Sequence, residues 1–125
     1  MATTPEGKVK KEINRIIANY GTRIYRFMPV PSGYQSVTLD YLLCVNGYFV
    51  AIEAKRPGGK PTPLQNATIE EITRAGGVAI VVDGTNESLN NLNNLLFKLL
   101  TSNNENFKDF AEITMQAMQA SKGKK

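Results

Sequence analysis

The fold is decided by residues 40–55, whose sequence is DYLLCVNGYFVAIEAK. Two apolar runs flank the dipeptide Asn46-Gly47, which is the strongest two-residue signal for a type I′ turn between antiparallel strands. We therefore expect a β-hairpin with strands over 37–45 and 48–55. Three charged residues interrupt its apolar faces, all at the end away from the turn: Asp40, Glu53 and Lys55.

The turn also determines which side chains of the hairpin are neighbours. Counting outward from Asn46-Gly47 places Asp40 directly opposite Glu53, on the same face of the sheet. Lys55 points to that face as well, because side chains alternate along a strand. The sequence therefore predicts two carboxylates and one ammonium group side by side.

Two neighbouring carboxylates need an explanation, because at about 5 Å and an effective dielectric constant of about 20 they repel by about 3 kcal/mol. A divalent cation removes this repulsion, and Mg²⁺ is commonly bound through one or two carboxylates together with substrate phosphate. We therefore infer a Mg²⁺ site at Asp40 and Glu53, with Mn²⁺ as a substitute. The alternative is a structural ion network in which Lys55 neutralises the two acids.

The segments around the hairpin predict helices on both faces of an α/β mixed sheet. Their order is α-β-β-β-α-β-α-α, with one strand–helix–strand crossover. Apart from the hairpin, the expected elements are a helix over 6–20, a strand over 23–27, a helix from Thr62 to Gly76-Gly77, a strand over 78–82, a helix capped by Ser88 and a final helix over 106–120.

Apolar spacing also predicts which side chains are buried. Thr62 and Gln65 form a capping box at the start of their helix, and the apolar run 78–82 is typical of a strand that is buried on both faces. Cys44 is expected to be a buried, inert thiol. The inward-facing stripes of two helices are Leu64, Thr68, Ile72 and Ala75 in the first, and Leu89, Leu92, Leu95, Leu96 and Leu99 in the second.

The absence of histidine limits the chemistry that the chain can perform. It excludes His general bases, Ser-His-Asp triads and ordinary His/Cys zinc sites. Carboxylates, lysine, hydroxyls and oxygen-bound metals remain.

The chain has 125 residues, of which 42% are hydrophobic, and this suits one domain. We divide it into a catalytic core over 6–84, C-terminal helices over 86–120 and a disordered basic tail over 121–125. No apolar run is long enough to cross a bilayer, and the N-terminus lacks the apolar centre of a signal peptide. We therefore expect a soluble, cytoplasmic protein.

The net charge of +4 is compatible with nucleic-acid binding. Arg56 and Lys60 bracket a glycine- and proline-rich loop that follows the third strand directly, beside the predicted metal. Phosphate contacts from this loop would be independent of sequence and sensitive to salt. Lys8, Lys11 and Arg15 in the first helix are further candidates for DNA binding. The alternative for each cluster is an ordinary solvated surface.

An ordered set of residues joins these features. It starts at Gly33 and continues with Asp40 at the entry to a strand, Ile52-Glu53-Ala54-Lys55, Lys60-Pro61-Thr62-Pro63 and Gln65. This set resembles the VRR-NUC nucleases of the PD-(D/E)XK superfamily, and in layout the small single-domain phage and bacterial members. The resemblance covers about residues 6–84. Leu39 stands where the family often has proline.

The resemblance implies a restriction-endonuclease-like PD-(D/E)XK core and a role for each site residue. Asp40 and Glu53 would hold Mg²⁺ together with the backbone carbonyl of Ala54. Lys55 would position or activate the attacking water and offset negative charge on the phosphate. Gln65 would orient Lys55, the water or the phosphate, and helix capping is its other role.

Family members also use a glutamate of the first helix as a further metal ligand. Glu12 is the candidate here, and Glu6 is the second choice. The alternative for Glu12 is an ordinary surface charge that balances Lys8, Lys11 or Arg15.

The activity that the resemblance implies is that of a Mg²⁺-dependent, structure-selective DNA endonuclease. It would behave like a Holliday-junction resolvase and act as a homodimer. One alternative keeps the chemistry but takes flaps, nicks or ordinary duplex as substrate. The other is a catalytically silent nucleic-acid-binding module with the same fold.

Overall fold

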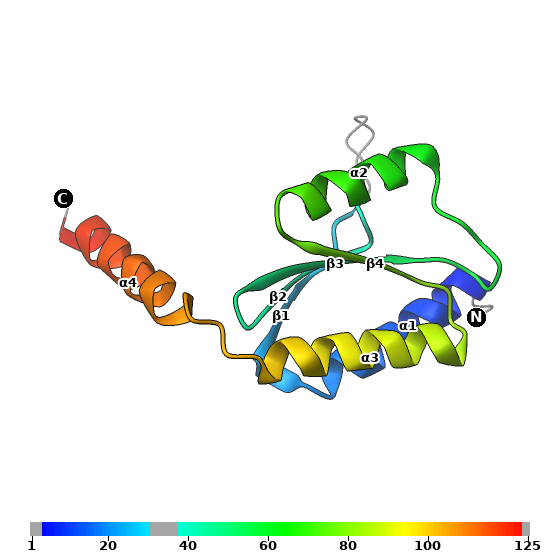
Figure 1. The fold of residues 1–125 in the computed structure, drawn as a ribbon, viewed down its shortest axis with the longest axis horizontal. Coiled ribbons are helices and arrows are strands. Elements are labelled where there is room, and N and C mark those ends of the chain that lie inside the picture. The colour runs from blue at the N-terminus through cyan, green and yellow to red at the C-terminus, as the bar shows by residue number, and fades with distance from the viewer. Residues whose placement is uncertain (1–3, 31–37, 124–125) are drawn as a thin grey trace.

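The computed structural model describes residues 4–30 and 38–123, and Figure 1 shows the arrangement of the elements. In chain order they are α1 (Pro5–Ala18), a 3₁₀ turn (Gly21–Arg23), β1 (Ile24–Phe27), β2 (Tyr41–Val45), β3 (Tyr48–Ala54), α2 (Pro63–Arg74), β4 (Val78–Val82), α3 (Asn86–Thr101) and α4 (Phe107–Gly123). This is the predicted order of helices and strands around a mixed sheet. Among the described residues, no helix combines the length and apolar character needed to cross a membrane.

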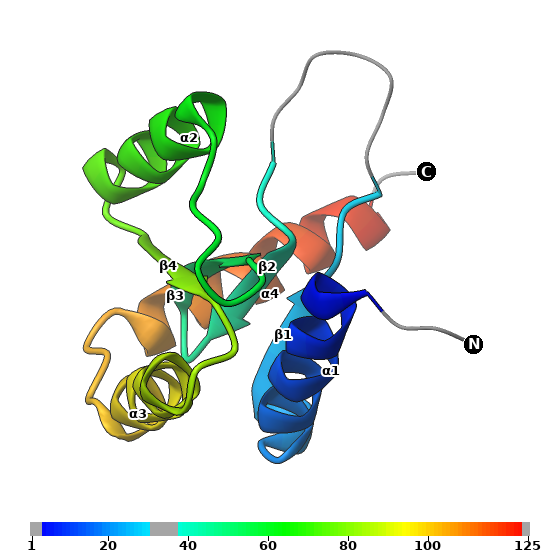
Figure 2. The ribbon, with the colours of Figure 1, turned by 90° about the vertical axis from the view of Figure 1, so that its right-hand side faces the viewer.

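The four strands form one sheet in the order β1-β2-β3-β4. β1, β2 and β3 are antiparallel neighbours, whereas β4 runs parallel to β3, as the crossover through α2 requires. α2 covers one face of the sheet, and α1 and α3 cover the other (Figure 2). The chain is therefore a three-layer α/β arrangement.

The hairpin forms as predicted. Asn46 and Gly47 have φ angles of 52° and 82°, which is the left-handed backbone that a type I′ turn needs at both positions. Val45 pairs with Tyr48, and the register continues to the pair Tyr41 and Ile52. The predicted start of the second strand at 37 lies outside the described residues, as does Gly33, and residues 38–40 are not part of the strand.

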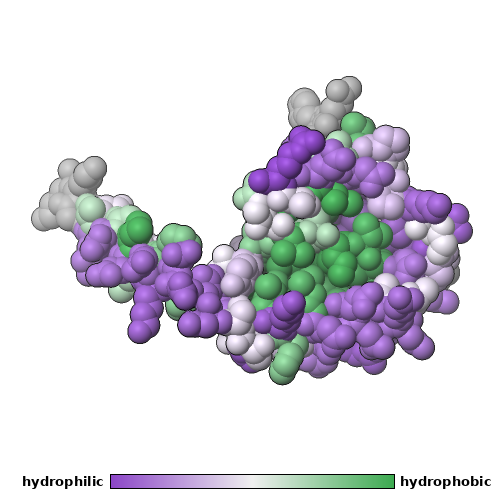
Figure 3. Space-filling view, in the orientation of Figure 1, coloured by the Kyte–Doolittle hydropathy of each residue, from purple (hydrophilic) through white to green (hydrophobic). Residues whose placement is uncertain are grey.

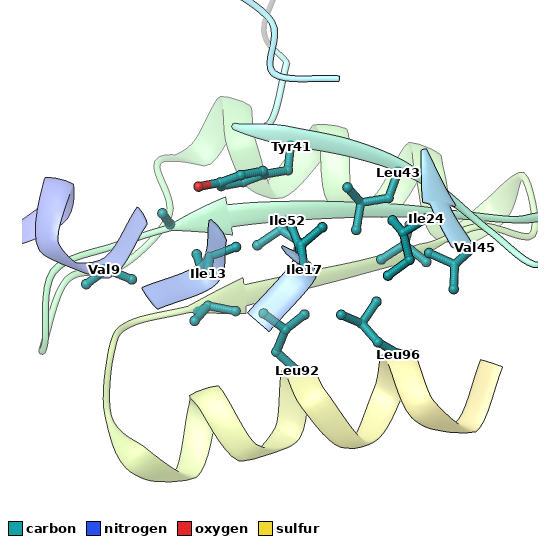
Figure 4. Packing of buried hydrophobic residues seen from close by; sticks show 13 residues of the cluster. Val9, Ile13, Ile17, Ile24, Tyr41, Leu43, Val45, Ile52, Leu92 and Leu96 are labelled. Carbon is teal, nitrogen blue, oxygen red and sulfur yellow. The ribbon is translucent and has the colours of Figure 1, made fainter. Parts of the chain in front are cut away.

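The core lies between the sheet and the layer of α1 and α3 (Figure 4). Ile13 of α1, Leu92 and Leu96 of α3, and Tyr41 of β2 have no exposed surface. Burying such side chains contributes about 1.5–3 kcal/mol each. This layer therefore fixes α1 against the strands that carry the charged residues.

The other face of the sheet is less covered than predicted. Cys44 is exposed, because α2 lies over β3 and β4 and leaves this part of β2 open (Figure 2). Leu64 of α2 is 65% exposed, Ala75 is also exposed, and no residue of that helix is buried. The predicted inner stripe of α2 is therefore wrong at its two ends, whereas its middle residues Thr68 and Ile72 are partly buried.

The strand β4 has the predicted bounds but not the predicted burial. Only Val82 is buried, whereas Val78–Val81 are partly exposed. The reason is its place in the sheet, because β4 is an edge strand with a neighbour on one side only.

Two predictions on helix ends are also wrong. Thr85, not Ser88, caps α3, because its side chain accepts the backbone N–H of Ser88. The helix therefore begins one turn earlier than predicted. α4 continues to Gly123, so residues 121–123 are helical and not a disordered tail, and residues 124–125 lie outside the described part.

Candidate active site

Asp40 stands directly before β2, and two contacts hold its carboxylate. Its Oδ2 accepts the backbone N–H of Ala54 at 2.8 Å. This bond joins the two chain segments beyond Tyr41 and Ile52, the last backbone pair of β2 and β3. Its Oδ1 lies 3.4 Å from Lys10 Nζ of α1. The carboxylate is therefore fixed at the end of the sheet, beside the last residues of β3.

Glu53 is buried in β3, with 3% of its surface exposed. Its Oε2 accepts a 2.9 Å hydrogen bond from Gln65 Nε2 and lies 3.5 Å from Lys55 Nζ. Its Oε1 is buried and has no hydrogen-bond partner in the described structure. A buried, unpaired carboxylate oxygen costs free energy, so this atom marks a position at which a ligand could bind.

The environment of Glu53 favours its protonated form. Burial raises the pKa of Glu53 from its ordinary value of 4.5 to about 7, and the neighbouring Asp40 carboxylate acts in the same direction. The Lys55 ammonium lowers the pKa of Glu53 without cancelling these effects. The two predicted acids are therefore close enough to interact.

Gln65 holds two positions at once. The capping box of α2 is present, because Gln65 Oε1 accepts from the Thr62 backbone N–H and Thr62 Oγ1 accepts from the Gln65 backbone N–H. The Nε2 of the same side chain donates to Glu53. Capping and contact with the site thus occur together, and the site residue that Gln65 contacts is Glu53, whereas the prediction named Lys55, the water or the phosphate.

Lys55 ends the hairpin beside a hollow of about 470 Å³. Only 15% of the Lys55 side chain is exposed. Arg56, Lys60 and Glu6 line the same hollow. The two loop cations are therefore on the side of the molecule that holds the acids, and Glu6 is near them.

The cations predicted in α1 do not line the hollow beside Lys55. Lys8 lines a neighbouring hollow with Pro57 and Gly84. Arg15 is ion-paired with Glu12, and both line a groove between α1 and α3. Lys11 is exposed on α1.

Glu12 is therefore not placed with Asp40 and Glu53. Within residues 4–30 and 38–123, no three His, Cys, Asp or Glu side chains group in a way that could hold a metal. Of the two glutamates considered in the first helix, Glu6 lies nearer the site, because it shares a hollow with Lys55.

Lys10 and Tyr41 also shape the site, and sequence reasoning did not identify them. Tyr41 donates its hydroxyl to the Lys10 carbonyl at 3.1 Å, and burial followed by the Asp40 charge raises the pKa of Tyr41 to about 12. This bond holds α1 where Lys10 reaches Asp40. Helical spacing could have identified Lys10. It adjoins the inward-facing Val9, and it lies one turn before Asn14, which accepts a hydrogen bond from Arg26 of β1.

No protein-family model matches the chain, and a search of curated proteins finds no relative. The geometry of the site is therefore what bears on its function.

Proposed function

We propose that the chain is a Mg²⁺-dependent nuclease whose active site comprises Asp40, Glu53, Lys55 and Gln65. The observation that carries this proposal is the buried Glu53, which lies next to a second acid and has one oxygen unpaired. A protonated Glu53 can share its proton with Asp40, but the ionised form leaves this oxygen without a hydrogen-bond donor among the described residues. A cation that binds both acids would satisfy this oxygen and would also remove their repulsion.

The donor set fits a hard divalent cation. Two carboxylates meet here, and the backbone of Ala54 lies between Glu53 and Lys55 with its N–H on Asp40. Mg²⁺ uses one or two carboxylates together with substrate phosphate oxygens, so a third acid is not required. Asp40, Glu53 and the Ala54 carbonyl would hold it, and when bound it would polarise the scissile phosphate and acidify a water.

The remaining residues would position the substrate. Lys55 lies close to Glu53 and beside the hollow, where its ammonium would offset charge that develops on the phosphate. Gln65 holds Glu53 by its amide and so orients the carboxylate. Arg56 and Lys60 line the same hollow and would contact neighbouring phosphates of the backbone.

The finer assignment rests on the resemblance to the VRR-NUC nucleases described above. On this assignment the α-β-β-β-α-β part is a PD-(D/E)XK core, and the substrate is branched DNA such as a four-way junction. The enzyme would act in the cytoplasm. It would act as a homodimer, because a two-fold pair of sites suits a two-fold junction.

Nicking of supercoiled plasmid with Mg²⁺ and with EDTA tests the proposal. Wild-type protein should nick only with Mg²⁺, and Asp40→Asn or Lys55→Ala should remove nicking while DNA binding in a gel-shift assay remains. Nicking in EDTA, or wild-type rates in both variants, would contradict the proposal. Binding without any nicking in the wild type would identify a silent binding module.

The substrate class needs a separate comparison. Four-way junction, flap, nicked and linear DNA of matched length should be cleaved at different rates, with the junction fastest. Equal rates on all four would favour the non-specific duplex nuclease.

A further inference from the structure

Within the described part of the chain, no element covers the apolar side of the helix α4. Residues 107–122 are all exposed, and α4 projects from the rest of the molecule (Figure 1). Five large apolar side chains are each 51–61% exposed: Phe107, Phe110, Ile113, Met115 and Met118. Most helical stability in proteins comes from packing of an apolar face, so a surface that covers this face would stabilise α4.

The spacing of these side chains makes one face of α4 apolar. Phe107, Phe110 and Met118 follow each other at helical intervals of three or four residues and their multiples. Lys108, Asp109, Glu112, Gln116 and Gln119 occupy the opposite side. The helix is thus built to lie in an apolar groove with its polar side in water.

The same chain offers such a groove. Figure 3 shows apolar surface gathered between α2 and α3, where the edge strand β4 forms the floor. We call this the β4 trough and define it by Ile72 of α2, Val78–Val81 of β4 and Leu95 of α3, all partly exposed. Leu95 belongs to it because it lies on the opposite flank of α3 from Asn93, which accepts from Tyr20 of α1.

The β4 trough is wide enough for a helix, and the exposed edge of β4 is a surface that a helix could cover. Helices on the two faces of a sheet each lie about 10 Å from it, which leaves room for one helix about 10 Å in diameter at the edge. The edge strand Val-Ala-Ile-Val-Val has no charge, proline or bulge to prevent pairing with another chain. Natural proteins cover such edges, often with a helix.

The linker between α3 and α4 directs α4 away from the trough of its own chain. Asn104 Nδ2 donates to the Asn46 carbonyl at 2.9 Å, and Asn46 Nδ2 donates to the Leu99 and Ser102 carbonyls at 3.0 Å each. These bonds tie the linker to the hairpin turn, from which α4 points outward (Figure 1). Folding back into its own trough would require the linker to change course at Asn104, whose bond to Asn46 fixes its present direction.

We propose that α4 seats in the β4 trough of a second copy of this chain, in a reciprocal two-fold exchange. Four of the exposed apolar side chains share one face of α4 (Phe107, Phe110, Ile113 and Met118) and bring on the order of 400 Å² per helix, so two helices with two troughs would bury roughly 1,600 Å² in total. This area is in the range of stable dimers. The inference does not depend on the proposed nuclease activity.

Light scattering after size-exclusion chromatography in EDTA tests the exchange. The wild type should have twice the mass of one chain. The double variant Phe110→Asp and Ile113→Asp should be monomeric, with dimer affinity lower by at least 100-fold. Gln116→Asp, on the polar side of α4, is the matched control and should remain dimeric. A monomeric wild type, or a double variant that stays dimeric, would overturn the proposal.

Disulfide trapping identifies the surface that receives α4, and it does not depend on the folding of the charged variants. In a Cys44→Ser background, one chain carries Met118→Cys and a differently tagged chain carries Ile72→Cys. Mixing should give a disulfide between the two kinds of chain. When both changes are on one chain, a disulfide that forms within that chain at high dilution would overturn the exchange. So would mixed chains that never cross-link.

Discussion

Each end of the β2–β3 hairpin carries a polar side chain in partly or fully buried surroundings, and the two ends differ in how these side chains are hydrogen-bonded. At the turn, Asn46 places a polar side chain among partly buried backbone groups, and its amide is satisfied by the carbonyls of Leu99 and Ser102. At the other end, Glu53 is buried beside Asp40, and one of its oxygens is left without a partner. The turn end is a completed structural network, whereas the acidic end is an incomplete one.

On the proposed function, this difference separates a group that stabilises the fold from a group that binds a ligand. Buried polar atoms are nearly always hydrogen-bonded, and an exception needs an explanation such as a bound ion, an ordered water or a catalytic role. We therefore expect substitutions at the turn end to change stability and leave chemistry intact. Substitutions at the acidic end should remove chemistry without lowering stability.

The largest expected effect is the loss of activity in Glu53→Gln. The change is isosteric but removes the charge that would hold Mg²⁺, so the nicking rate should fall by about 10³-fold or more. Glu70→Gln is the matched control, because its carboxylate is exposed on α2 and pairs with Arg74. A nicking rate for Glu53→Gln within threefold of the control would contradict a role of the acidic end of the hairpin in catalysis.

The second effect concerns stability and pH in the absence of metal. The native pKa of Glu53 is about 7 against an ordinary 4.5, so the native state binds more protons than the unfolded state between these values. Stability should therefore fall as pH rises through this window, by up to about 3 kcal/mol, and be constant above it. Urea unfolding at pH 5 and pH 8 in EDTA measures the fall.

Two comparisons test whether Glu53 causes this fall in stability with rising pH. Glu53→Gln should lose this part of the pH dependence, and Mg²⁺ should restore wild-type stability at pH 8. An equal fall in Glu53→Gln would assign the pH dependence to other groups.

The third effect is at the turn end. Asn46→Ala removes two hydrogen bonds and places alanine at a φ of 52°, so the free energy of unfolding should fall by about 2–3 kcal/mol. Asn46→Gly removes the same two hydrogen bonds, but glycine adopts this positive φ without strain, so the free energy of unfolding should fall by less. Thermal melts measure both. Nicking by Asn46→Ala should remain near the wild-type rate at a temperature where it is folded, and a 100-fold loss would contradict this.

The smallest effect is on DNA binding by the loop cations. Arg56→Ala or Lys60→Ala should weaken binding a few-fold for all sequences and reduce the slope of log affinity against log salt by about 1. Arg74→Ala, far along α2, is the control. Salt titrations of binding by fluorescence anisotropy give both quantities. An unchanged slope in both loop variants would remove the loop from the phosphate-binding surface.

The features predicted correctly are those set by neighbouring residues. The Asn46-Gly47 turn and the Thr62 capping box each depend on a few adjacent side chains, and both are present. The hairpin register follows from the turn, and with it the approach of Asp40 to Glu53. Local chemistry was therefore sufficient for the most informative part of the candidate site.

The features predicted wrongly depend on which surfaces other elements cover. Cys44 stands in an apolar run and is exposed, because α2 covers only part of one face of the sheet. Leu64 has the spacing of an inward-facing residue and is also exposed, because it lies at the start of α2 beyond the contact with the sheet. The contact of Lys10 with Asp40 arises from the packing of α1 across the sheet. No local pattern determines these distant contacts.

The most direct test of the central claim is crystallographic. Crystals grown with Mn²⁺, with data collected at the manganese absorption edge, should show one anomalous difference peak per chain at the acidic end of the hairpin. The account predicts that this ion is bound by Glu53 Oε1 and by Asp40. A map with no peak there at saturating Mn²⁺, or with Glu53 Oε1 turned to a protein partner instead, would contradict it.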